Sequence, residues 1–204
     1  MNAREAILAR IHAALGGEQQ APLVHACGPQ PAPYADPALR FIDCATRLAS
    51  SVTRVDVRAE VPQAVAHYLT VSQLGQVAVC WPELLDLEWI ASGLNVIARE
   101  VEPEDAVGIT GAYCGIAETG TLMLLAGRDT PAALSLLPET HIAVLDARRI
   151  VPTMEAAWAL LRQEHGQLPR AVNFVSGPSR TADIEQTVTL GAHGPARVHI
   201  VMVG

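Results

Sequence analysis

Lysine is absent from this chain of 204 residues, and its fourteen side-chain cations at neutral pH are all arginines. The absence excludes chemistry that needs a lysine amine, such as Schiff-base formation, a P-loop phosphate site or a kinase-type site. Asp and Glu outnumber the arginines and leave a formal net charge of −7. This balance does not favour nucleic acid or an anionic membrane surface as a partner, because both select basic patches.

Cysteine is scarce, and the four present are far apart, at Cys27, Cys44, Cys80 and Cys114. Iron–sulfur and zinc sites usually use cysteines in close pairs, so we expect no cluster held by this chain alone. No two histidines and an acid share metal-ligand spacing, so no metal site is predicted. No Gly-x-Gly-x-x-Gly follows a strand pattern, which argues against a standard dinucleotide fold and leaves the cofactor unknown.

Long apolar runs are also missing. No segment approaches the ~20 apolar residues that a membrane-spanning helix needs. Charged or polar side chains at Arg4, Glu5, Arg10 and His12 interrupt the first seventeen residues, so these do not read as a signal peptide. We therefore expect a cytoplasmic protein with reduced thiols and no membrane insertion.

Half of the residues are apolar and 17% are charged, which is typical of a globular chain with a sizeable core. From Asp36 onward, strand patterns alternate with helix patterns of about ten residues, which predicts an α/β fold of three layers with a mostly parallel sheet. The expected strands are "VTRVDV", "QVAVCW", "NVIAR", "TLMLLAG", "HIAVLDA", "AVNFVSG" and "RVHIVMVG". The expected helices start at Asp36-Pro37 and cover "VPQAVAHYLTV", "PELLDLEWIAS" and "PTMEAAWALLRQEHG", with a short helix or turn at "TPAALSLLPET".

The N-terminal region has a different pattern. Ile7, Leu8, Ile11 and Leu15 share one face of a predicted amphipathic helix over residues 2–15, which Gly16-Gly17 end. A proline-rich stretch follows, so the predicted division is a helix at 1–16, a linker at 17–37 and a domain at 38–204. The apolar face of this helix packs either on its own domain or on a second copy or partner, and homo-oligomerisation through it is one of these alternatives.

The string "SGPSRTADIEQT" follows the predicted strand "AVNFVSG" and is dense in small polar groups. A helix starting near Ser179 or Thr181 would present free N–H groups and a partial positive charge at the end of a strand, where α/β sheets bind ligands. This pattern favours an anion-binding loop, and a well-capped helix is the structural alternative. The predicted ligand-binding residues here are Ser176, Gly177, Ser179, Arg180, Thr181, Asp183 and Glu185.

Two further motifs carry candidate residues. In "GIAETGT", Glu118 is a lone acid among apolar and glycine residues, and is either a catalytic base, nucleophile or ligand anchor, or an acid that binds nearby backbone N–H groups. In "LGAHGP", His193 is a candidate general acid or base, or a solvated loop histidine. The accompanying ligand-binding candidates are Gly111, Thr119, Gly120, Thr121 and Gly194.

The strings "GITGAYCGIAETGTLMLL", "SLLPETHIAVLD" and "GPSRTADIEQTVTLGAHGP" followed by "RVHIVMV" resemble the LUD-domain family, in its lactate-utilization protein C group. The resemblance covers roughly residues 40–204. It implies a fold like that of CoA transferases, ribose-phosphate isomerases and 5-formyltetrahydrofolate cyclo-ligase. It also implies a role in oxidising L-lactate to pyruvate alongside two partner proteins, at least one of which carries iron–sulfur clusters.

The family's residues match at Glu118, Thr119 and Gly120 and throughout the last motif, but Tyr113 stands where the family usually has an acid. Two functions follow. The chain is either a non-redox, ligand-binding subunit of a lactate-oxidising assembly, or a stand-alone enzyme that acts on a carboxylate, a CoA thioester or a sugar phosphate. A purely structural role is a third interpretation.

Overall fold

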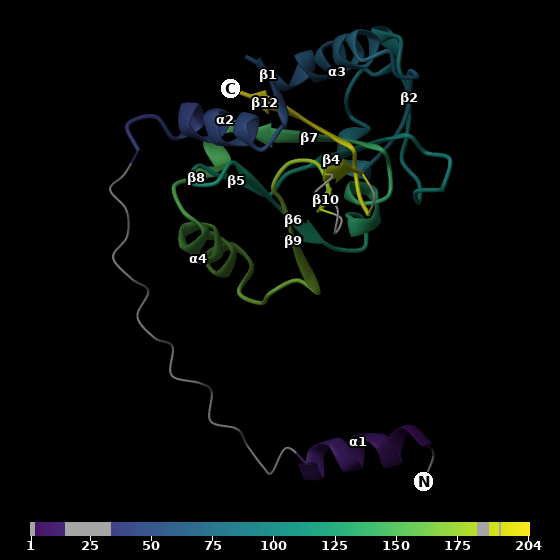
Figure 1. Cartoon of the computed structure of the whole chain (residues 1–204), viewed down its shortest axis with the longest axis vertical. Coiled ribbons are helices and arrows are strands. Elements are labelled where there is room, and N and C mark those ends of the chain that lie inside the picture. The colour runs from purple at the N-terminus through teal and green to yellow at the C-terminus, as the bar shows by residue number, and fades with distance from the viewer. Residues whose placement is uncertain (1–2, 15–33, 183–187, 192) are drawn as a thin grey trace. The chain divides into compact units, whose positions relative to one another are not determined.

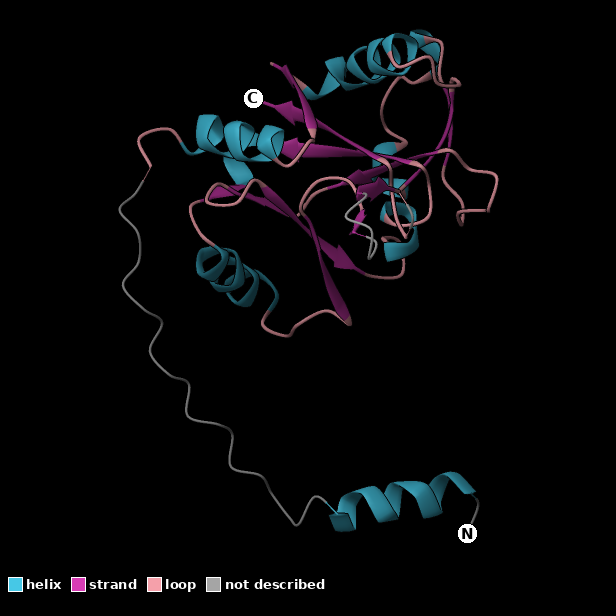
Figure 2. Ribbon diagram, viewed as in Figure 1, coloured by secondary structure: helices cyan, strands magenta, loops and turns pink. Residues whose placement is uncertain are grey.

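The computed structural model describes residues 3–14, 34–182, 188–191 and 193–204, which form two separate units (Figures 1 and 2). One unit is helix α1 (Ala3–Ala14), on which Ile7, Leu8 and Ile11 are exposed. The other is the domain that begins at Tyr34. Most of the predicted linker lies outside the described residues, so the boundaries at 17 and 37 stay predictions. Within the described residues, no helix has the length and apolar character to cross a membrane.

The domain is built around a six-stranded sheet with the order β1-β12-β7-β4-β2-β3, most of whose strands are labelled in Figure 1. All five of its strand pairings are parallel. The carboxyl ends of these strands therefore meet at one edge, and the connections must cross the faces of the sheet. The predicted α/β class with a mostly parallel sheet is confirmed. The strands are β1 (Ser51–Val55), β2 (Val77–Cys80), β3 (Asn95–Ile97), β4 (Val107–Gly111), β7 (Thr140–Asp146) and β12 (Arg197–Val203).

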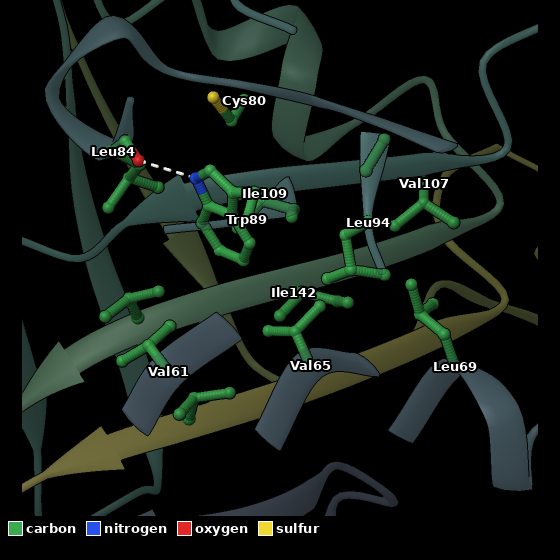
Figure 3. Close-up of a cluster of buried hydrophobic side chains, with 13 residues drawn as sticks. Val61, Val65, Leu69, Cys80, Leu84, Trp89, Leu94, Val107, Ile109 and Ile142 are labelled. Atoms are coloured by element: carbon green, nitrogen blue, oxygen red, sulfur yellow. Dashed lines mark hydrogen bonds between the residues drawn. The ribbon is translucent and has the colours of Figure 1, made fainter. Parts of the chain in front are cut away.

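Helix α3 (Val61–Val71) covers one face of this sheet. Its residues Val61, Val65 and Leu69 are fully buried and pack in one cluster with Ile109 and Ile142 of the sheet (Figure 3). Because these three side chains recur every four residues, they line a single face of the helix. The cluster anchors α3 to the strands whose carboxyl ends form the candidate site below.

The opposite face of the parallel sheet is covered by helix α2 (Pro37–Arg47) and by a second sheet. The second sheet has the order β8-β5-β6-β9 and pairs β5 with β6, and β6 with β9, in antiparallel fashion. Its outer face packs against α4 (Met154–His165) through Ala157 and Leu161. The predicted strands "TLMLLAG" and "AVNFVSG" are confirmed as two of its strands, but the sequence did not predict a second sheet. Its strands are β5 (Cys114–Ile116), β6 (Thr121–Ala126), β8 (Ile150–Val151) and β9 (Ala171–Val175).

The helix boundaries follow from local chemistry. The Asp36 carboxylate accepts a 2.9 Å hydrogen bond from the Leu39 N–H, and Pro37 occupies the first turn, where its missing N–H costs nothing. Thr153 caps α4 in the same way, and Gly166, with a φ of 62°, ends it. The helices predicted from Asp36-Pro37 and over "PTMEAAWALLRQEHG" are confirmed.

The helix predicted over "PELLDLEWIAS" is wrong. The segment forms two 3-10 turns, Pro82–Leu84 and Ile90–Ser92. The indole N–H of Trp89 donates a 2.7 Å hydrogen bond to the Leu84 carbonyl (Figure 3). In an α-helix this carbonyl would instead accept from the backbone N–H four residues further along. Burial of Trp89 in the core thus outweighs the helical pattern of the segment. A further 3-10 turn, Ala132–Ser135, agrees with the short helix or turn predicted at "TPAALSLLPET".

The helix predicted near Ser179 or Thr181 is also wrong. Residues Arg180–Ala182 form strand β10, which pairs in antiparallel fashion with β11 (Val188–Leu190). The Ser179 carbonyl extends this pairing, since it accepts a hydrogen bond from the Gly191 N–H at 2.9 Å. The Ser179 N–H donates to the Pro195 carbonyl, also at 2.9 Å. No helix N-terminus is therefore available at Ser179 to bind an anion. Asp183 and Glu185 lie outside the described residues.

Candidate functional site

The "GIAETGT" and "SGPSR" motifs meet at the C-terminal half of α2. Gly120 has a φ of +68°, and a methyl group on it would overlap the backbone of Ala45. Gly177 has a φ of +81°, and a methyl group on it would overlap the carbonyl oxygen of Leu48. Both glycines are therefore required by the close approach of the α2 backbone, together with a conformation that side chains disfavour.

Hydroxyl groups join the same two motifs. The Thr121 hydroxyl lies 2.8 Å from that of Thr119 and 2.8 Å from that of Ser176. The Thr121 side chain is buried, whereas Thr119 and Ser176 are exposed. The structure thus brings these predicted site residues together, from the start of β6 and the end of β9.

Arg180 and Glu118 also contact α2. Arg180 is exposed and donates a 3.1 Å hydrogen bond to the carbonyl of Leu48, the residue that follows the helix, where a cation is favourable. The backbone carbonyl of half-buried Glu118 accepts hydrogen bonds from the Arg40 guanidinium at 3.4 Å and the Cys44 thiol at 3.5 Å. These contacts give both motifs a structural task in holding α2.

Gly111 lies elsewhere, at the carboxyl edge of the parallel sheet. Two adjoining cavities of about 260 and 280 Å³ share Glu83, Gly111 and Ala112, and together we call them the carboxyl-edge cleft. The first, the arginine cavity, is lined by Arg58, Glu83, Leu84, Gly111, Ala112, Val144, Asp146, Arg148 and Val203. The second, the aromatic cavity, is lined by Trp81, Glu83, Gly111, Ala112, Tyr113, Leu125, Thr130 and His165. Ligands of open α/β sheets bind at this edge.

Ion pairs hold the two arginines of the arginine cavity. Arg58 donates to the Glu83 carbonyl at 2.8 Å and to the Asp86 carboxylate at 2.9 Å. Arg148 binds both oxygens of Asp146, the last residue of β7, and this hydrogen bonding lowers the pKa of Asp146 below its usual value. A guanidinium carries five N–H donors, more than these bonds use, so both arginines retain donors for a carboxylate or phosphate.

Glu83 lies at the junction of the two cavities. A methyl group on Gly111 would overlap its Oε1, so the carboxylate sits directly over the backbone of Gly111. Glu83 was not among the residues predicted from the sequence. Its position in the sequence could have identified it as a candidate. Glu83 is the first acid after the predicted strand "QVAVCW" and therefore lies past the carboxyl end of that strand.

Tyr113, which lines the aromatic cavity, forms a hydrogen-bonded cluster with Arg149 and Glu164. Glu164 accepts two hydrogen bonds from Arg149, at 2.7 and 2.8 Å, and one from the Tyr113 hydroxyl at 2.7 Å. These bonds, led by those of Arg149, lower the pKa of Glu164 to about 2. Burial and the bond to Glu164 raise the pKa of Tyr113 to about 12. Tyr113, at the position where the family usually has an acid, thus keeps its proton.

His193 and Gly194 line a different cavity, of about 580 Å³, at the amino edge of the sheet. Three carboxylates, Glu104, Asp105 and Glu139, also line it, and the last two are paired with arginines. An acidic lining disfavours a small anion. The structure therefore does not bring His193 together with Glu118 or with Gly111.

Two buried histidines, His141 and His199, were not predicted as site residues from the sequence. His141 on β7 shares a 2.8 Å hydrogen bond with the Thr110 hydroxyl, and His199 on β12 shares one of 2.8 Å with Ser51. The His199 ring also stacks on Tyr68, with centroids 3.8 Å apart. Burial lowers the pKa of both histidines to about 4, so both are neutral at pH 7. The available signal was that each histidine lies within a predicted strand, His141 in "HIAVLDA" and His199 in "RVHIVMVG".

The fold and the cleft define an α/β protein with a parallel sheet and a small-molecule-sized cleft at the carboxyl ends of its strands. Residues 87–203 match the sequence model of the LUD domain family, and the chain belongs to this family. Both "GIAETGT" and the last motif lie within the matched region.

Curated relatives point the same way. "Lactate utilization protein C" of Bacillus licheniformis is 34% identical over 119 residues, and that of Bacillus subtilis is 38% identical over 119 residues. In both cases the match covers 57% of this chain and 49% of the relative. The chain thus spans about half the length of the curated relatives it matches.

The chain is also similar to solved structures. The crystal structure of a DUF162 family protein from Deinococcus radiodurans aligns with 85% of this chain and 100% of its own, at 26% identity and a TM-score of 0.61. A D-ribose-5-phosphate isomerase aligns with a TM-score of 0.30, which is too low to establish a shared fold.

Proposed function

We propose that the chain is a component of an L-lactate utilization system and that it binds a small carboxylate, lactate or its oxidation product pyruvate. The observation that carries the proposal is the 34–38% identity with two proteins named lactate utilization protein C. The arginine cavity supplies the matching chemistry, since the guanidinium groups of Arg58 and Arg148 suit a carboxylate and the Glu83 carboxylate can accept the hydrogen of an α-hydroxyl group.

The proposal includes iron–sulfur partner proteins that carry the electrons. Cys44, Cys80 and Cys114 are buried thiols on three separate elements. Burial raises the pKa of Cys80 and of Cys114 to about 11, which disfavours the thiolate that binds iron. A non-redox, ligand-binding subunit in the cytoplasm fits these thiols. The alternative is a stand-alone enzyme acting on a carboxylate, CoA thioester or sugar phosphate, and turnover by the isolated chain would favour it.

Binding of L-lactate and pyruvate, measured by isothermal titration calorimetry, tests the proposed site. Arg148→Ala is expected to weaken binding by about 1.5–3 kcal/mol, tenfold or more, because it removes donors and leaves the Asp146 charge uncompensated. Arg47→Ala is the matched control, since Arg47 is exposed on α2 and paired with Asp43, away from both cavities.

Arg180→Ala tests the loop predicted from the sequence. If the ligand binds at Ser179–Thr181, Arg180→Ala weakens binding as much as we expect of Arg148→Ala, and the stability of the fold changes little. If the ligand binds in the arginine cavity, Arg180→Ala leaves the dissociation constant unchanged. Failure of both carboxylates to bind the wild-type chain would contradict the proposed ligand class.

Removal of residues 1–16 is expected to leave the domain folded and to change the association state of the chain. Helix α1 forms a unit of its own and exposes Ile7, Leu8 and Ile11, which need an apolar partner. Light scattering gives the association state and circular dichroism gives the fold. Ile7→Ser with Ile11→Ser should reproduce the effect, while Arg10→Ala should not. An unfolded product, or an unchanged association state, would contradict this role.

A further inference from the structure

The aromatic cavity has a chemistry distinct from that of the arginine cavity beside it. Its lining includes three aromatic residues, Trp81, Tyr113 and His165, together with Leu125 and the shared Glu83. A lining rich in aromatic residues, with one carboxylate acceptor, suits a planar ring that carries N–H donors rather than a small aliphatic acid.

The two larger rings are fixed in place before any ligand binds. The Trp81 indole donates a 3.3 Å hydrogen bond to the Pro131 carbonyl. Arg149 lies over the Tyr113 ring at 4.6 Å from its centroid and donates a 2.9 Å hydrogen bond to the Tyr113 carbonyl, while the Tyr113 hydroxyl binds Glu164. A wall held in this way loses little conformational freedom on binding, which favours affinity.

The two cavities share Glu83, Gly111 and Ala112 in their linings, and together they have a volume in the range of small-molecule sites. At the junction the Glu83 carboxylate lies over the backbone of Gly111, so a ligand that spans the cleft must contact or displace this carboxylate. Such a ligand would place a ring against the aromatic walls and an anionic group beside Arg58 and Arg148.

We propose that the carboxyl-edge cleft binds a planar heteroaromatic ring linked to an anionic group, with the ring in the aromatic cavity and the anion in the arginine cavity. This ligand is additional to the small carboxylate proposed above, and its ring subsite stands on separate residues. Nucleotide bases and flavins share the required chemistry.

Calorimetry with AMP and with flavin mononucleotide tests the inference and distinguishes the two ring types. Adenosine and inorganic phosphate are run beside them, so that the ring and the anion are each measured alone. We expect AMP or flavin mononucleotide to bind at least tenfold more tightly than phosphate. We expect His165→Ala to weaken that binding about fivefold through loss of a ring contact.

Gly111→Ala is the second variant, because its methyl group displaces the Glu83 carboxylate at the junction while touching no backbone of another segment. It should weaken the linked ligands more than phosphate alone. His67→Ala is the matched control, since His67 is an exposed helix histidine outside both cavities. Melting temperatures confirm that each variant is folded.

The inference is overturned if neither ring compound binds the wild-type chain, if phosphate binds as tightly as both, or if His165→Ala and Gly111→Ala leave their affinities unchanged. Lactate and pyruvate binding is read separately, through Arg148→Ala. If AMP or flavin mononucleotide binds but lactate and pyruvate do not, the proposed function alone is refuted. If lactate or pyruvate binds but neither ring compound does, the ring subsite alone is refuted.

Discussion

Gly120→Ala and Gly177→Ala are each expected to destabilise the domain by about 3 kcal/mol or more. Their φ angles of +68° and +81° cost a residue with a side chain about 1–2 kcal/mol. The added methyl group also overlaps the α2 backbone at Ala45 or Leu48, which cannot rotate away as a side chain could, and overpacking of this kind costs about 1–3 kcal/mol more. Urea unfolding monitored by circular dichroism measures the loss.

Gly93→Ala provides the matched control. Gly93 has a φ of +79°, but no atom lies within 4 Å of where its methyl group would be. This variant should therefore lose only the conformational part, about 1–2 kcal/mol. If Gly120→Ala costs no more than Gly93→Ala, α2 does not need the close approach, and these glycines regain their interpretation as part of a ligand site.

Acid is expected to destabilise the domain between about pH 6.5 and pH 4 through His141 and His199. Both have a pKa of about 4 in the folded chain and about 6.5 when unfolded, so the unfolded state binds more protons in this window. The stability they contribute is present above pH 6.5 and is lost as the pH falls to 4, at up to about 3 kcal/mol for each histidine. Glu164, with its pKa of about 2, acts in a lower window, between about pH 4.5 and pH 2.

The cause lies in the surroundings of the two rings. Nδ1 of His141 and Nε2 of His199 are buried and have no hydrogen-bond partner among the described residues. Protonation would place an unpaired charged N–H at each position. Urea midpoints at pH 7 and pH 4.5 measure the loss, and His141→Asn with His199→Asn should reduce the difference.

A second measurement is needed in case that double variant does not fold. The ring-proton resonances of the wild-type chain report each imidazole directly, and those of His141 and His199 should show no titration down to pH 5. Resonances that titrate near pH 6.5 would contradict the assignment of these histidines to the acid response.

The regular part of the fold could be predicted because its signals are local. Strands such as "HIAVLDA" are continuous apolar runs, and α3 repeats Val61, Val65 and Leu69 at helical spacing. The second sheet could not be predicted in the same way. Its strands β5 and β6 pair across a turn in a glycine-rich segment, and β9 joins them from about fifty residues further along the chain.

The site illustrates a different limit. "SGPSRT" carries the residues of a helix cap, but these also suit a strand, and the antiparallel pairing of Arg180–Ala182 with Val188–Leu190 decides the outcome. The density of glycine and hydroxyl groups predicts ligand binding, and the structure shows in addition that Gly120 and Gly177 permit the close approach of α2. Gly111 was identified from the sequence, but Glu83, Arg58 and Arg148 were not, because only the parallel sheet brings them to one edge.

The most direct test of the central claim is a titration of the ¹⁵N-labelled 21.6 kDa chain with L-lactate, followed by backbone amide resonances. The proposed site predicts that the largest shifts fall at Glu83, Gly111, Ala112 and Arg148, around the arginine cavity, and that Arg148→Ala removes them. Largest shifts at Ser176–Arg180 or at Gly191–Gly194, or no shifts at all, would contradict the assignment of ligand binding to the carboxyl edge of the sheet.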